Sequence, residues 1–199
     1  MLEKLNQADK ELLLTLNQLN LPWLDPVMLF LTKTWAWIPL YALLIYLVIK
    51  VYKNRSWIPL AGTALTITLT DRLTSGLMKP YFARVRPSHN PELANMLHLV
   101  DGYKGGEFSF VSGHAANSFA TALLVWLLLR NHYPATRWLF AWAAFMSYTR
   151  IYLGVHYPGD ILAGALTGMA CAATIYLGMK KSFSKVFTDY DSKPLLPKQ

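Results

Sequence analysis

Five long runs of apolar residues alternate with short polar segments along this chain of 199 residues. The runs cover Val27–Ile49, Trp57–Met78, Ser112–Leu129, Thr136–Ile151 and Asp160–Met179. Because a helix needs roughly 20 mostly apolar residues to cross a bilayer, we expect about five transmembrane helices, of which the fourth is the shortest. The pattern predicts an all-α fold, a polytopic membrane helix bundle over residues 25–179 within one domain of residues 1–199.

The two ends of the chain differ from these runs. Near the N-terminus, leucines recur at nearly helical spacing and charged residues occupy the rest of the helical wheel, the leucines being Leu5, Leu12, Leu16 and Leu19. This predicts an amphipathic helix over residues 1–24, either in the membrane interface or packed on the bundle as a sixth helix. Acidic residues and the lack of an early apolar core argue against a cleaved signal peptide. Residues 180–199 are expected to form a polar tail.

Composition agrees with a membrane protein, since 54% of the residues are hydrophobic and only 15% are charged. The net charge of +8 does not indicate nucleic-acid binding, because lysines and arginines form no basic stripe with interleaved aromatic residues. Instead they lie between the apolar runs, as membrane flanks and anion ligands do. Purely basic clusters follow the first, third and fifth runs, which favours that side as cytoplasmic. The loop of residues 79–111 then faces the periplasm or the exterior.

Three polar clusters are expected at this outer edge of the membrane. They are the segments KPYFARVRP, FSFVSGHAANS and RIYLGVHYPGD, and each adjoins an apolar run. Ionisable groups near hydrocarbon are costly, which favours a functional site over chance placement. The clusters supply eight candidate site residues: Lys79, Arg86, Ser112, Gly113, His114, Arg150, His156 and Asp160.

These residue types suit phosphate chemistry. Lysine and arginine offer cations whose N–H groups match phosphate oxygens, and a Ser-Gly helix start adds backbone N–H donors. One neutral imidazole can attack phosphorus while another protonates the leaving oxygen. His156 is the better candidate nucleophile, because Asp160, four residues later, can fix its tautomer. His114 is then the general acid, and the reaction needs no metal and no cofactor.

In this order, the motifs resemble the signature of the type 2 phosphatidic acid phosphatase superfamily, membrane phosphatases that share an active-site core with vanadium haloperoxidases. The matching segments are Lys79-x6-Arg86-Pro87, Ser112-Gly113-His114 and Arg150-x5-His156-x3-Asp160. The resemblance implies that His156 forms a phosphohistidine oriented by Asp160, that His114 is the acid, and that the phosphate is bound by Lys79, Arg86, Ser112, Gly113 and Arg150.

Two residues depart from the family pattern. Val111 stands where proline is usual, and Thr149 stands where serine is usual. Valine loses some rigidity at the turn and threonine keeps the hydroxyl, so these changes bear on efficiency more than on reaction class.

Several other polar residues have open roles. Arg84 fits a lipid-headgroup anchor as well as a site residue. Arg72 precedes Lys79 by about two helical turns and is expected on the same face, where it can support the phosphate site or pair with an acid; the role of Asp71 is equally open. The loop residues His89, Glu92, His98 and Asp101 match no metal-ligand spacing, so we predict no metal site.

Together these features predict an integral lipid phosphatase of the inner (plasma) membrane that hydrolyses a phosphomonoester or diphosphate at the outer leaflet. The small size, the few-span layout and the amphipathic N-terminus resemble the compact family members that recycle undecaprenyl diphosphate, and this resemblance favours that substrate, while phosphatidylglycerophosphate, phosphatidate and lipid A phosphates stay open. The alternative from another class, a membrane transporter, would string polar groups through the bilayer, whereas here they gather at one edge. A soluble haloperoxidase conflicts with the five apolar runs. The oligomeric state is open.

Overall fold

The computed structural model describes residues 2–93 and 95–191, and its regular elements are all helical, which confirms the predicted all-α class. The α-helices are α1 (Leu2–Asn17), α2 (Asp25–Leu31), α3 (Ile38–Tyr52), α4 (Trp57–Asp71), α5 (Lys79–Phe82), α6 (Gly113–Leu129), α7 (Leu139–Tyr152), α8 (Pro158–Ser182) and α9 (Ser184–Asp191). A π-helical segment, Arg72–Met78, joins α4 directly to α5. Short 3-10 helices are Thr34–Trp37, Lys53–Arg55, Pro87–His89, Val100–Gly102 and Pro134–Trp138.

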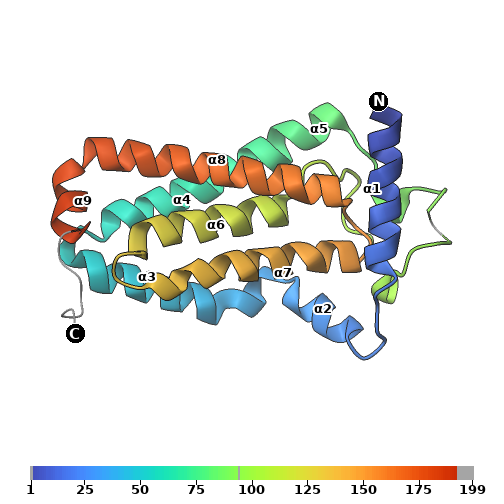
Figure 1. The fold of residues 1–199 in the computed structure, drawn as a ribbon, viewed down its shortest axis with the longest axis horizontal. Coiled ribbons are helices and arrows are strands. Elements are labelled where there is room, and N and C mark those ends of the chain that lie inside the picture. Colours follow the sequence, from blue (N-terminus) through green and yellow to red (C-terminus); the bar gives the residue numbers. More distant parts are fainter. Residues whose placement is uncertain (1, 94, 192–199) are drawn as a thin grey trace.

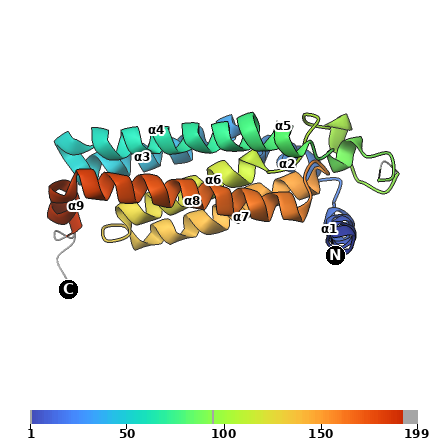
Figure 2. The ribbon, with the colours of Figure 1, turned by 90° about the horizontal axis from the view of Figure 1, so that it is seen from above.

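The long helices α3, α4, α6, α7 and α8 run lengthwise through an elongated bundle (Figures 1 and 2). Four of them follow the second to fifth apolar runs closely. The first run differs, because α2 ends at Leu31 and α3 begins only at Ile38. Polar residues Thr32 to Thr34 interrupt the run, and Pro39 in the first turn of α3 favours a new helix start.

Two helical segments are long and apolar enough to cross a membrane by length and composition, Thr34–Arg55 and Pro158–Ser182, and Gly113–Leu129 is a shorter apolar helix. Many large apolar side chains on the long helices point outward, as lipid-facing side chains do. Examples more than 40% exposed are Leu43, Ile49, Trp57, Leu65, Leu166 and Leu177. The total of about five spans stays a prediction.

Helix α6 occupies the middle of the bundle and packs closely on α8. Gly164 and Gly168 permit this approach. A Cβ atom at Gly164 would lie 2.5 Å from the carbonyl oxygen of Ser112, and one at Gly168 would overlap the backbone of Ala116. The glycines therefore hold the start of α6 against the start of α8, where two of the three polar clusters lie.

Helix α1 lies across one end of the bundle, transverse to the long helices (Figures 1 and 2). Leu13 and Asn17 of this helix are buried, and the Asn17 amide donates hydrogen bonds to backbone carbonyls of the loop of residues 79–111 and of α7. The helix is thus packed on the bundle. Three leucines of the predicted stripe remain largely exposed, Leu5, Leu12 and Leu19.

The opposite end carries α9, which lies in the segment that we expected to be a polar tail. Val186 and Phe187 are buried there, and the Phe187 ring contacts the rings of Tyr52 and Tyr176 edge to face. Residues 184–191 therefore form a packed helix. The rest of the predicted tail, residues 192–199, lies outside the described residues.

Candidate active site

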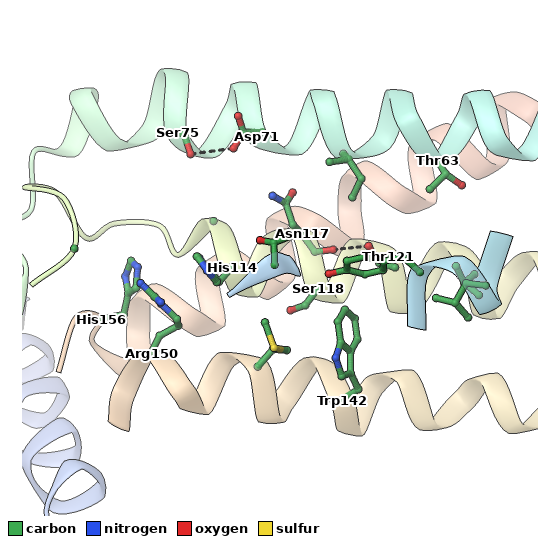
Figure 3. Close-up of a pocket in the computed structure, with 18 of the residues that line it drawn as sticks. Thr63, Asp71, Ser75, His114, Asn117, Ser118, Thr121, Trp142, Arg150 and His156 are labelled. Carbon is green, nitrogen blue, oxygen red and sulfur yellow. Dashed lines mark hydrogen bonds between the residues drawn. The ribbon is translucent and has the colours of Figure 1, made fainter. Parts of the chain in front are cut away.

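A cavity of about 590 Å³ extends between α3, α4, α6 and α7, and its polar part lies toward the end that α1 covers (Figure 3). The structure brings the three polar clusters together around this part. Six of the eight predicted site residues line the cavity: Lys79, Arg86, Gly113, His114, Arg150 and His156. The other two, Ser112 and Asp160, are buried directly behind it.

Arg86 is held rigidly in this cluster. It is only 6% exposed, its Nε donates to the carbonyl of Phe108 at 3.1 Å, and its Nη1 donates to the carbonyl of Val155 at 3.4 Å. Gly105, at φ +67°, leaves room for the guanidinium, because a Cβ there would lie 2.6 Å from Nη1. Burial, followed by repulsion from Arg150, lowers the pKa of Arg86 to about 10. The group stays charged at neutral pH, and an anion would relieve the repulsion.

Thr32 organises the other side of the site. Its hydroxyl accepts a 2.6 Å hydrogen bond from Nη1 of Arg150 and one of 3.1 Å from the Thr149 hydroxyl, while its carbonyl lies 3.2 Å from Nε2 of His114. Arg150 also donates to the Tyr103 hydroxyl at 3.2 Å. Thr32 lies within the first predicted membrane span, and its role at the site was not predicted from the sequence. The polar Thr-Lys-Thr interruption of the first apolar run was the feature that could have revealed it.

His156 and Asp160 form a buried pair. Nδ1 of His156 lies 3.4 Å from Oδ2 of Asp160, at the upper end of hydrogen-bond distances, and Oδ2 also accepts from the backbone N–H of Tyr157 at 2.9 Å. Burial, reinforced by the nearby Arg86 and Arg150, lowers the pKa of His156 well below its ordinary value. The imidazole is therefore neutral at neutral pH, as a nitrogen nucleophile must be. With Nδ1 turned to Asp160, Nε2 is left for the cavity.

The Ser-Gly motif forms the start of α6. The Ser112 hydroxyl accepts from the backbone N–H of Ala115 at 3.4 Å as the N-cap, and the Ser112 N–H donates to the carbonyl of Asp160 at 3.0 Å. Gly113 follows on the cavity wall. The positive end of the α6 dipole thus lies beside the cationic cluster, which adds to its attraction for an anion.

Asp71 and Arg72, whose roles were open, lie where α4 meets the π-helical segment: Asp71 ends α4 and Arg72 begins the segment. Asp71 lines the cavity and accepts a 3.2 Å hydrogen bond from the Ser75 hydroxyl (Figure 3), whereas Arg72 is exposed and does not line it. The expectation that Arg72 shares the face of Lys79 assumed a regular α-helix. In a π-helix the backbone hydrogen bonds join residues five apart instead of four apart. Arg72 and Lys79 therefore no longer lie on the same face.

Arg84 makes its contacts on the far side of Asp160 from the cavity. Its Nη1 donates to Oδ1 of Asp160 at 2.7 Å, and its Nη2 donates to Oδ2 of Asp9 at 2.8 Å. The guanidinium carbon lies 3.9 Å from the centroid of the Tyr157 ring. Although burial opposes its charge, the carboxylates of Asp160 and Asp9 raise the pKa of Arg84 above its ordinary value. In the part of the chain that the structure describes, Arg84 thus pairs with two carboxylates, which favours a role at the site over that of a lipid-headgroup anchor.

Comparison with known proteins decides the family. The model of the PAP2 superfamily matches residues 55–184, a range that holds all eight candidate residues. The chain belongs to the PAP2 superfamily. It is 40% identical over 174 residues to a lipid A 4'-phosphatase of Bacteroides thetaiotaomicron, with 84% of this chain and 75% of that protein covered. An undecaprenyl-diphosphatase of Sulfolobus acidocaldarius is 32% identical over 164 residues, with 79% and 72% covered.

A solved structure agrees with this assignment. The crystal structure of Aquifex aeolicus LpxE matches this PAP2 chain with a TM-score of 0.64 and 26% identity, covering 84% of this chain and 93% of that one. The predicted family and the predicted hydrolase class are thereby confirmed: this PAP2 protein is a membrane lipid phosphatase.

Proposed function

We propose that this PAP2 phosphatase removes a phosphate from an acylated glycolipid of the lipid A type through a phosphohistidine on His156. The proposal rests on the finding that one continuous cavity has both a polar and an apolar part. Its polar part holds two histidines and three cations, and its other part is lined by apolar side chains of α3, α4 and α6: Leu44, Ile45, Val48, Leu60, Ile67 and Val125. This shape suits a phosphate attached to an apolar chain.

Polar atoms in the middle of the cavity favour a glycolipid over a prenyl diphosphate. Oδ1 of Asn117 and Nε1 of Trp142 are buried without a hydrogen-bond partner within the described part of the chain, and both residues line the cavity (Figure 3). Leaving such an atom unpaired costs about 1–3 kcal/mol. A prenyl chain offers neither a donor nor an acceptor, whereas sugar hydroxyls and acyl amides offer both. The 40% identity to a lipid A 4'-phosphatase points the same way.

The proposed reaction has two steps. In the first, Lys79, Arg86 and Arg150 hold the phosphate, Nε2 of His156 forms a bond to phosphorus, and the bond from phosphorus to the lipid oxygen breaks. His114, which enters this step protonated on both ring nitrogens, gives its Nδ1 proton to that oxygen and becomes neutral, and Asp160 stabilises the positive charge on His156.

In the second step, water attacks the phosphohistidine. His114 takes the proton of the water, the phosphorus–nitrogen bond breaks, and inorganic phosphate leaves with both histidines restored. Because the Thr32 carbonyl can only accept, the Nε2 atom of His114 beside it carries a proton. Nδ1 is then the atom of His114 that exchanges protons with the substrate.

The test is phosphate release from a panel of lipids by the purified protein in detergent with excess chelator. We expect lipid A to be hydrolysed faster than undecaprenyl diphosphate, phosphatidylglycerophosphate and phosphatidate. The variant Asn117→Leu should lose activity on lipid A selectively, with the neighbouring Thr121→Val, which also lines the cavity, as the control. Faster hydrolysis of undecaprenyl diphosphate than of lipid A would instead make undecaprenyl diphosphate the preferred substrate. Loss of all activity with chelator would contradict the metal-free mechanism.

We further propose that the active site opens at the outer leaflet of the inner membrane. The two ends of the bundle offer exposed positions for labelling, Met96 near the site and Asn54 at the other end. In a Cys171→Ala background, a membrane-impermeant thiol reagent should label Met96→Cys in intact cells and leave Asn54→Cys unlabelled. The reverse pattern would place the site in the cytoplasm.

A further inference from the structure

An arginine links the side chains of the N-terminal helix to the active site. Asp9 on α1 accepts a hydrogen bond from Arg84 at 2.8 Å, and Arg84 donates to Asp160 at 2.7 Å. The other oxygen of Asp160 lies 3.4 Å from His156. A continuous series of polar contacts therefore joins α1 to the proposed nucleophile. Asp9, where the series begins, lies 75 residues before Arg84 in the sequence.

Arg84 is not placed to bind the phosphate. It does not line the cavity, and its two terminal nitrogens are both used by carboxylates. Its backbone is also fixed, because its carbonyl accepts from the Ser109 backbone N–H at 2.7 Å, and the ring of Tyr157 covers its guanidinium. Such a rigid, planar group can hold the carboxylate of Asp160 in one orientation.

Asp9 is equally constrained. Its second oxygen accepts a 2.7 Å hydrogen bond from the backbone N–H of Gly159, in the first turn of α8. A Cβ at Gly159 would lie 2.8 Å from this carboxylate, so a larger residue there would force the Asp9 side chain to shift. Leu13 and Asn17, buried one and two turns further along α1, anchor the helix. The helix thus presents Asp9 at a fixed point beside the start of α8.

We propose that Asp9 and Arg84 are positioning residues, through which α1 keeps the Asp160 carboxylate charged and aimed at His156. This inference rests on the proposed roles of His156 and Asp160. A carboxylate with no exposed surface is stable only when its charge is paired, and His156 is neutral until it attacks. Arg84 supplies the pairing charge in the resting enzyme. Asp9 fixes Arg84 by accepting from its second nitrogen, which also donates to Oδ1 of Asn6 on α1 at 2.9 Å.

The test compares kcat and KM of the full-length protein in detergent, with dioctanoyl phosphatidate and lipid A as probes. Hydrogen-bond partners that orient metal ligands typically contribute about 10–100-fold. By analogy, we expect Arg84→Gln to lower kcat by a factor in that range at nearly unchanged KM. Arg84→Lys should recover part of the loss. Asp9→Asn should lower kcat several-fold, and adding it to Arg84→Gln should cause little further loss, because the two residues act in series.

The matched control is Glu92→Gln. Glu92 pairs with Lys10, the neighbour of Asp9 on α1, at 2.6 Å, and this exposed ion pair does not touch Asp160. Its loss should leave kcat within twofold of the wild type. An equal loss in Glu92→Gln and Asp9→Asn would overturn the proposal, because it would mean that α1 acts only by docking. Wild-type kcat in Arg84→Gln, with His156→Ala inactive, would overturn it while leaving the proposed function intact.

A second measurement does not depend on turnover. In protein labelled with 15N-histidine, the ring shifts of His156, assigned by their absence in His156→Gln, report the environment of Nδ1. They should change in Arg84→Gln and Asp9→Asn and stay constant in Glu92→Gln. Unchanged shifts in Arg84→Gln would refute the positioning role even if neither probe were a substrate.

Discussion

Oδ2 of Asp160 faces two groups at once, Nδ1 of His156 at 3.4 Å and the backbone N–H of Tyr157 at 2.9 Å. The second contact is part of the capping box that starts α8, with Asp160 at the third helical position. The same carboxylate therefore starts a helix and is aimed at the proposed nucleophile. The four-residue spacing is what allows both roles.

We predict that Asp160→Asn retains the helix cap and loses catalysis. The amide oxygen can still accept from Tyr157, but the side chain no longer stabilises a charged imidazole. The analogous change beside a catalytic histidine in serine proteases lowers kcat by about 10,000-fold, and we expect a loss of at least about 100-fold here. The measurements are kcat and the melting temperature. Asp25→Asn is the control: it weakens contacts with His98 and Tyr152 outside the cavity, so it should affect stability more than kcat.

Thr32→Val should weaken the phosphate site. The change removes the acceptor of the 2.6 Å hydrogen bond from buried Arg150, and hydrogen bonds to charged groups contribute about 1.5–3 kcal/mol. We expect kcat/KM to fall about tenfold or more, and Thr32→Ser to restore most of it. In Thr66→Val, a buried hydroxyl bonded only within α4 is lost, so phosphate release should stay near the wild-type rate. Equal losses in Thr32→Val and Thr66→Val would contradict the specific role of Thr32.

Much of the candidate site could be predicted from the sequence because the clusters lie at helix ends. Once the apolar runs are placed across a membrane, alternate ends share one edge, and this brings Lys79, His114 and His156 to one side without knowledge of any contact. Six of the eight candidate residues line the cavity as this reasoning requires. The pairing of His156 with Asp160 follows from spacing alone.

What could not be predicted depends on tertiary contacts or on a change of helical period. Thr32 reaches the site because α2 ends early, although the hydropathy of that run suggested one helix. Arg72 lies off the cavity because a π-helical segment shifts its register relative to Lys79. The contact of Asp9 with Arg84 joins segments far apart in sequence, and the charged residues of α1 gave no indication of a partner.

His156 should give the protein a distinctive pH dependence of stability. Its pKa is lowered in the folded state, chiefly by burial and then by Arg86 and Arg150, while an unfolded histidine titrates near about 6.5. Above that pH both states are neutral. As the pH falls below it, the unfolded chain gains a proton that the folded chain does not, so folding is destabilised. In His156→Gln, the drop in melting temperature between pH 7.5 and 5.5 should be smaller than in the wild type. His89→Gln, at an exposed position, is the control and should leave the drop unchanged.

Gly164→Ala should damage both folding and activity. The new methyl group would lie 2.5 Å from the Ser112 carbonyl, a backbone atom that cannot move aside easily. Overpacking of this kind typically costs about 1–3 kcal/mol. Because Ser112 caps α6 next to Gly113 and His114, separating α6 from α8 displaces one wall of the site. We therefore expect a lower melting temperature and a reduced kcat/KM for the lipid phosphate.

The control for this prediction lies on the same helix. A Cβ at Gly178 has no neighbour within 4 Å in the described part of the chain. Gly178→Ala should be neutral or slightly stabilising, because alanine is the better helix former by about 1 kcal/mol. If both variants behaved alike, close packing of α8 on Ser112 would not be what positions the start of α6. A loss confined to Gly164→Ala would tie the geometry of the phosphate site to this single backbone contact.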